Sequence, residues 1–142
     1  MAKRLADDVG FLLSRASGQV LKATNVALAA HGLRARQYAV LALACEAPDG
    51  SSQRHLAGVL GLDPSQVVQL VDELVAAGLV ERRVAEADRR TRLVVATAEG
   101  RRVGEAAGAD ADAAAEAPLV LLSEGERDVL RDALTRIWTA TG

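Results

Sequence analysis

A single pair of β-branched runs interrupts a chain that is otherwise patterned for helices. The two runs, residues 79–84 and 91–97, flank the polar segment 85–90, which is the pattern of a β-hairpin. Before and after them, apolar residues recur at helical spacing. The 142 residues include one Phe, one Trp and one Tyr, so the core must be built from Leu, Val and Ala. The sequence therefore predicts a mostly α-helical fold with one small β-hairpin.

Turn and capping residues divide the rest of the chain into helices. The predicted helices span residues 5–30, 35–47, 51–60, 64–77, 98–117 and 123–139. Asp63 is a suitable N-cap for the fourth helix, and Pro64 is a suitable first residue. Ser123 and Glu126 fit a capping box at the start of the last helix. The apolar face expected for the fourth helix consists of Val67, Leu70, Val71 and Leu74.

The charge balance and composition exclude several classes of protein. Seventeen Lys and Arg against nineteen Asp and Glu give a formal net charge of −2, so any contact with nucleic acid must come from a local basic patch. The one cysteine excludes an internal disulfide framework and a zinc site built from cysteines. No apolar run reaches the roughly 18 residues of a membrane span, and Asp7 and Asp8 stand where a signal peptide would be apolar. We therefore expect a cytoplasmic protein without a membrane partner.

Two short predicted helices joined by a glycine-containing turn, residues 51–60 and 64–77, are the pattern of a helix-turn-helix. The hairpin that follows makes it a winged helix. Residues 81–92 of this hairpin hold five Arg against three acidic residues, a local excess of positive charge suited to DNA phosphates. At the start of the second helix, the residues away from its apolar side are expected to read bases in the major groove. These residues are Ser65, Gln66, Val68 and Gln69.

The same region resembles the multiple-antibiotic-resistance regulator (MarR) family. The resemblance consists of short motifs that follow one another in the family's order: LRARQYAVL (33–41), SQRHLA (52–57), LDPS (62–65), LVDEL (70–74), GLVER (78–82), DRR (88–90) and TAEGR (97–101). The chain departs from the family pattern at Glu73, where the family often has Arg or Lys, and at His55, where it often has Glu.

The resemblance implies a winged helix-turn-helix at residues 33–97, between dimerisation helices at residues 1–32 and 98–142. Proteins of this family typically bind a pseudo-palindromic operator in double-stranded DNA as homodimers. They usually act as repressors, and many release the DNA when they bind a small, often aromatic, ligand. The long apolar stripes of the predicted terminal helices support dimerisation, because one small winged domain cannot cover them.

The resemblance also assigns individual residues. Family wings carry an acid that orients an arginine in the minor groove, and Asp88 and Arg90 match these positions, so we expect a charge-assisted bond between their side chains. The candidate DNA-contacting residues are Arg54, Ser65, Gln66, Val68, Gln69, Arg83, Asp88, Arg89, Arg90 and Arg92. For a ligand, Arg36 and Tyr38 fall where the family's pockets tend to lie, and His31 is included with them.

Two other functions are left open by the sequence. A winged helix can serve only for contact between proteins, although the arginines retained in the hairpin argue against this. A regulator can also sense oxidation, here through Cys45, but no His or Lys neighbours this residue in the sequence to lower the pKa of its thiol. No catalytic arrangement or cluster of metal ligands stands out, so we expect neither an enzyme nor a cofactor or metal site.

Overall fold

The structure is a computed structural model that describes residues 4–141, so residues 1–3 and Gly142 of the predicted terminal regions lie outside it. Its elements are η1 (Leu5–Asp7), α1 (Val9–Ala29), α2 (Ala35–Glu46), β1 (Ser51–Ser52), α3 (Gln53–Leu60), α4 (Pro64–Ala76), β2 (Val80–Val84), β3 (Arg92–Ala96), α5 (Ala98–Glu116), η2 (Ala117–Leu121) and α6 (Glu124–Ala140). The predicted fold class is confirmed: the chain is mostly helical, with a β-hairpin wing after a helix-turn-helix.

The hairpin of β2 and β3 is joined by a third strand, β1, that the sequence pattern did not predict. β3 lies in the middle of the sheet and is antiparallel to both neighbours, with Arg82 opposite Val94 on one side and Ser51 opposite Val94 on the other. Ser51 therefore belongs to the sheet and not to the start of a helix, because its backbone pairs with β3. Ser52 still caps α3, since its hydroxyl accepts a 3.1 Å hydrogen bond from the His55 N–H.

The first long helix starts later than its apolar stripe predicts. Asp8 is the N-cap of α1, and its carboxylate accepts a 2.9 Å hydrogen bond from the Phe11 N–H. This cap begins a new helix, so the residues just before it form the separate 3₁₀ turn η1. The stripe is not covered within the described chain: Leu5 and Val9 are 62% and 74% exposed.

The core lies where α2, α3, α4 and the end of α1 meet the sheet and α5. Its largest fully buried side chains are the leucines and valines Leu28, Leu41, Leu56, Leu74, Val40, Val67, Val71, Val80 and Val94. This agrees with the composition, which offers few aromatic residues. The predicted apolar face of α4 packs on the core at all four positions. Val67, Val71 and Leu74 are buried, and Leu70 is half-buried at the edge of a cleft.

A glycine at position 100 allows α5 to start in contact with the backbone that precedes the wing. A Cβ added to Gly100 would lie 1.8 Å from the backbone oxygen of Leu79. Thr97 fixes the same junction: its hydroxyl donates to the Gly78 carbonyl oxygen at 2.7 Å and accepts from the Gly100 N–H at 3.0 Å. Backbone contact at this point therefore sets the direction in which α5 leaves the winged helix.

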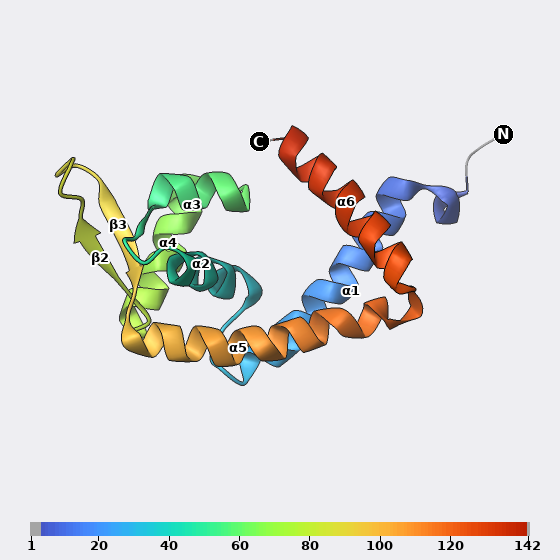
Figure 1. The fold of residues 1–142 in the computed structure, drawn as a ribbon, viewed down its shortest axis with the longest axis horizontal. Helices are drawn as coiled ribbons and strands as arrows, with labels where there is room; N and C mark the ends of the chain where they lie inside the picture. Colours follow the sequence, from blue (N-terminus) through green and yellow to red (C-terminus); the bar gives the residue numbers. More distant parts are fainter. Residues whose placement is uncertain (1–3, 142) are drawn as a thin grey trace.

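The outer elements extend away from the winged helix. α1 and α5 pack side by side, and α6 turns back from the far end of α5 (Figure 1). Ser123 and Glu126 form the predicted capping box of α6, yet this helix buries none of its residues. Large apolar side chains are exposed on these elements, among them Val9, Val120, Leu121, Val129, Ile137 and Trp138. Within residues 4–141, no helix is long and apolar enough to cross a membrane.

Candidate nucleic-acid interface

Helix α4 presents the predicted base-reading residues to solvent. Its apolar side faces the core, and all four residues of the opposite face and its flanks, Ser65, Gln66, Val68 and Gln69, are exposed. The Oε1 atom of Gln66 already accepts a 3.0 Å hydrogen bond from the Asp63 N–H at the start of the helix. A bidentate pair with adenine needs both the oxygen and the nitrogen of an amide. Gln69 makes no side-chain hydrogen bond within the described chain, so it is better placed than Gln66 to read a base.

Arg82 bridges the wing and the helix-turn-helix, a role that the sequence pattern did not predict. Its Nε donates to Gln53 Oε1 of α3 at 2.9 Å, and its Nη2 donates to the Val68 carbonyl oxygen of α4 at 3.3 Å. The same Nη2 lies 2.6 Å from Asp72 Oδ1. Arg82 thus joins the wing to both helices of the helix-turn-helix. Its position two residues after the buried Val80 is a usable signal, because alternate residues of a strand share a face.

At the tip of the wing, the Asp88 carboxylate bonds to groups of the turn and not to the guanidinium group of Arg90. Its Oδ1 accepts a 3.0 Å hydrogen bond from the Arg90 backbone N–H, and its Oδ2 accepts from the Thr91 hydroxyl at 3.2 Å. The expected bond between the Asp88 carboxylate and the Arg90 guanidinium is therefore wrong for this structure. A short Asp side chain reaches the backbone two residues later more readily than it reaches the end of a long arginine.

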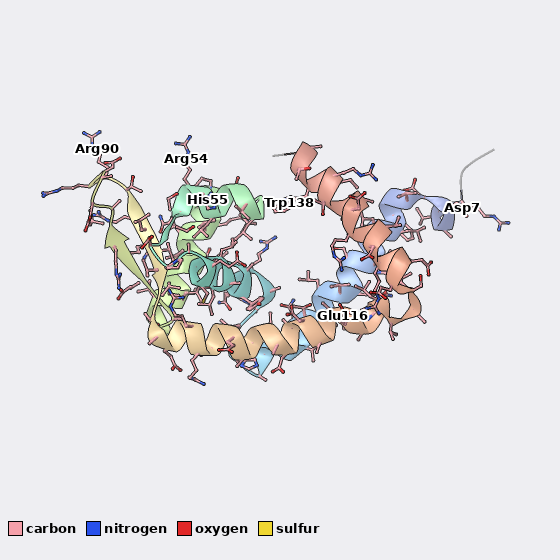
Figure 2. All side chains as sticks on the ribbon, in the orientation of Figure 1. Asp7, Arg54, His55, Arg90, Glu116 and Trp138 are labelled. Atoms are coloured by element: carbon pink, nitrogen blue, oxygen red, sulfur yellow. The ribbon has the colours of Figure 1, made fainter. Side chains whose placement is uncertain are left out.

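The remaining basic residues differ in whether their guanidinium groups already bond to another part of the chain. Arg92 Nη1 donates to the Arg89 carbonyl oxygen at 3.2 Å, and Arg83 Nε donates to Glu81 Oε1 at 2.7 Å. The guanidinium groups of Arg54, Arg89 and Arg90 are exposed and form no bond with another described residue. Figure 2 shows Arg54 on α3 and Arg90 on the wing extending from the same side of the molecule. These exposed arginines are the candidates for contact with nucleic-acid phosphates.

Two of the three candidate ligand residues, His31 and Tyr38, lie against neighbouring positions of α5. His31 Nε2 lies 2.7 Å from Asp110 Oδ2 and so links the end of α1 to α5. Tyr38 lies beneath α5, where a Cβ added to Gly108 would come within 2.8 Å of the tyrosine hydroxyl oxygen. Burial there is the main cause that raises the pKa of Tyr38. Arg36 lines a cleft on the side of α2 that faces α1 and α4.

That cleft, of about 430 Å³, lies between α1, the start of α2 and α4. Gln37 Nε2 donates to Glu73 Oε2 at 2.6 Å, and Arg34 Nη2 lies 3.6 Å from the same oxygen. Glu73 therefore connects α4 to α2, which explains what an acid does at this position. The residues that α2 and α4 contribute to this cleft are far apart in the sequence, so helical periodicity alone could not predict that they meet.

Cys45 is in an environment that disfavours its thiolate. The thiol donates to the Gly100 carbonyl oxygen at 3.9 Å. Burial is the main cause that raises the pKa of the thiol, and it outweighs the opposing effect of Arg101. A redox sensor needs a low thiol pKa, so this environment argues against the thiol switch. Among residues 4–141, no group of three or more His, Cys, Asp or Glu is arranged to hold a metal ion.

Comparisons with known proteins agree with this geometry. A sequence model of the MarR family matches residues 31–91. The chain is similar to CouR from Rhodococcus jostii RHA1 bound to p-coumaroyl-CoA, with 48% identity, 96% of each chain covered and a TM-score of 0.90. It is also similar to a transcriptional regulator (MarR family) from Rhodococcus sp. RHA1, with 47% identity, 96% of each chain covered and a TM-score of 0.91.

A third similar structure is the transcriptional repressor CouR bound to a 23-mer DNA duplex. It shares 29% identity over 96% of this chain and 98% of that chain, with a TM-score of 0.85. A comparison with curated proteins finds no match.

Proposed function

Because the chain belongs to the MarR family of transcriptional regulators, we propose that it binds a pseudo-palindromic operator in double-stranded DNA as a homodimer. In this proposal α4 enters the major groove and the wing contacts the minor groove. The main supporting observation is that α4 exposes a polar face while the guanidinium groups of Arg89 and Arg90 at the wing tip bond to no other described residue. Guanidinium groups without an intramolecular partner can bind DNA phosphates and enter a narrow minor groove. A similar structure, CouR, is bound to a DNA duplex.

The positions of the exposed apolar residues indicate which part of the chain would form the dimer. We assign DNA binding to residues 33–97 and dimerisation to residues 1–32 and 98–142. Leu121, Val129 and Trp138 are 89%, 70% and 60% exposed, and all three lie in the C-terminal region. An apolar surface of this kind needs a cover, and a second copy of the chain supplies one with twofold symmetry. Twofold symmetry in turn matches a pseudo-palindromic operator.

Regulation by a small molecule is the second part of the proposal. The 48% identical CouR is bound to p-coumaroyl-CoA, an aromatic acyl thioester, and the DNA-bound CouR is described as a repressor. We propose that this chain represses transcription and releases its operator when it binds a small, aromatic ligand. We also propose that the protein acts in the cytoplasm, because that is where it would meet operator DNA.

The proposal is tested with the DNA that lies directly upstream of the protein's own gene. Fluorescence anisotropy at fixed salt compares this DNA with a random duplex of the same length, and sedimentation velocity gives the oligomeric state. We expect a dimer that prefers the upstream DNA, and we expect the double variant Arg89→Ala/Arg90→Ala to lose most of its affinity. A monomer that still binds the operator tightly would contradict the dimer. Equal affinity for both duplexes would favour a winged helix used for protein contacts.

A further inference from the structure

We infer that His55 on α3 binds a DNA phosphate beside Arg54, and that the charge of its imidazole makes the affinity for DNA depend on pH. This inference rests on the proposed function and adds a contact to it. His55 is the third residue of α3, and both His55 and Arg54 are exposed. Figure 2 shows His55 beside Arg54, which extends from the same side of the molecule as Arg90 of the wing.

The exposed face of α3 consists of a positive and a titratable side chain with open space between them. Successive residues of a helix are turned by about 100°. Leu56 and Ala57 are buried in the core, so Arg54 and His55 lie on either side of the opposite, solvent-facing side. Gly58 lies between these two directions one turn later, and a Cβ added there would meet nothing within 4 Å. An anion can therefore approach this face without a side chain in its way.

The imidazole of His55 has no bonding role within the described chain. The His55 backbone N–H donates to the Ser52 hydroxyl at 3.1 Å, which caps α3. A glutamate at this position would complete a capping box by accepting from the Ser52 N–H, but the imidazole makes no such bond among residues 4–141. The side chain is exposed and does not pack in the core. It is therefore free to bind a partner.

The acids that surround α3 do not neutralise this face. α2, α4, β1 and β3 pack against α3. The charged residues on these four elements are Arg36, Glu46, Asp72, Glu73 and Arg92. Asp72 is paired with Arg82, and Glu73 accepts from Gln37. Within the described part of the chain, none of the five forms an ion pair with His55, and the charged residue next to it on α3 is the basic Arg54.

A phosphate of the DNA backbone is the anion that suits this face. The Arg54 guanidinium carries its charge at every pH used below, and a protonated imidazole donates from both ring nitrogens. The first turn of a helix also favours an anion, because its N–H groups have no partner within the helix. Histidine ordinarily gains or loses its proton between about pH 5 and 8. Since the protonated form attracts phosphate, the affinity for DNA should be high at low pH and fall as the pH rises.

The test measures the Kd for the upstream DNA and for a random duplex by fluorescence anisotropy, from about pH 5.5 to 8 at constant ionic strength. We expect the Kd of the wild-type protein to rise by about 4- to 25-fold over this range. An exposed ion pair contributes about two- to fivefold, and the proposed dimer carries two copies of His55. The factor should be the same for both duplexes, because a phosphate contact carries no sequence information.

Three variants assign the effect to one residue. His55→Gln is uncharged over the whole range, so it should lose most of the pH dependence and bind like the wild type at the high end. His55→Lys is always charged, so it should bind more tightly than the wild type at the high end, whereas damage to the fold would weaken it. His31→Gln is the matched control: it changes the second of the two histidines, which is bonded to Asp110 of α5, and it should keep the pH dependence. Circular dichroism melts check that each variant is folded.

A wild-type Kd that is equal at both ends of the range would overturn the inference and leave the proposed function intact. Unchanged pH dependence in His55→Gln would do the same and place the titrating group elsewhere. A pH effect on the upstream DNA alone would mean that His55 reads a base, which overturns the phosphate contact. Absence of DNA binding by the wild type at every pH would overturn the proposed function and the inference together.

Discussion

The carboxylate of Asp88 is bonded to the backbone of Arg90 and not to its guanidinium group, with Oδ1 accepting a 3.0 Å hydrogen bond from the Arg90 N–H. Its second oxygen accepts from the Thr91 hydroxyl, and the Thr91 N–H donates to the Asp88 carbonyl oxygen at 3.0 Å. These bonds fix the turn at the tip of the wing. They leave the Arg90 guanidinium without an intramolecular partner, and we therefore propose that Asp88 positions the wing.

Asp88→Ala should weaken operator binding by about 1 kcal/mol, because loss of its hydrogen bonds frees the turn that presents Arg90. Simple electrostatics gives the opposite sign, since the change removes a negative charge near DNA. Asp88→Asn is the matched control: it loses the charge but keeps an oxygen that can accept from the Arg90 N–H, and it should retain most of the affinity. Fluorescence anisotropy with the operator measures all three proteins. Tighter binding by Asp88→Ala would show that the wing is only a diffuse basic patch.

Arg90→Ala should weaken operator binding and reduce the slope of log K against log salt by about one unit, as expected when one phosphate-neutralising charge is lost. Arg83→Ala removes an equal charge from an arginine already paired with Glu81, so its effect on the slope should be smaller. Titrations at four or more salt concentrations separate the two variants. Identical slopes for Arg90→Ala and the wild type would place Arg90 outside the interface.

Gln69→Ala should weaken binding to the operator by about 1–3 kcal/mol while the affinity for random DNA barely changes, because a lost base contact affects only the cognate sequence. Gln66→Ala should in addition lower the melting temperature, since Gln66 Oε1 accepts from the Asp63 N–H at the start of α4. Paired anisotropy and thermal melts measure both effects. Equal losses on operator and random DNA would mean that Gln69 reads no base.

Arg82→Ala should lower the free energy of unfolding by about 1–3 kcal/mol, because it removes hydrogen bonds that join β2 to α3 and α4 and leaves the part-buried Gln53 Oε1 without its donor. Arg82→Lys should not restore the loss, since an ammonium group cannot reproduce the planar fork. Arg102→Ala, which breaks an exposed pair with Glu99, should change stability by no more than about 0.5 kcal/mol. Urea denaturation gives the values, and equal effects at 82 and 102 would contradict the bridging role.

Gly100→Ala should destabilise the protein by about 1–3 kcal/mol or more, because its new Cβ would lie 1.8 Å from a backbone oxygen that cannot move without shifting the wing. Gly58→Ala is the control within a helix: a Cβ at position 58 meets nothing within 4 Å, and the change should stabilise by about 0.5–1 kcal/mol. Thermal and urea denaturation compare the two variants. A stable Gly100→Ala protein would mean that α5 can leave the winged helix in another direction.

The sequence alone predicted the parts of the fold that depend on neighbours a few residues apart. The capping box of Ser123 and Glu126, the start of α4 at Pro64 and the hairpin around residues 85–90 all depend on such local interactions, and the structure shows each of them. The exposed face of α4 was predictable for the same reason, because 3.6 residues per turn determine which side chains share a side. The N-cap at Asp8 is also a local interaction, but the sequence pattern did not predict it because the apolar stripe continues on both sides of Asp8.

What only the tertiary structure decided is the set of partners from distant parts of the chain. Arg82 bonds to α3 and α4, Glu73 is held by Gln37 of α2, and Ser51 pairs with β3. Periodicity states which face of an element a residue occupies, but not which element packs on that face or at what distance. That choice depends on how the helices and strands pack around the core as a whole. Local sequence therefore determined the elements and their exposed faces, while packing determined which side chains are bonded and which remain available for DNA or a ligand.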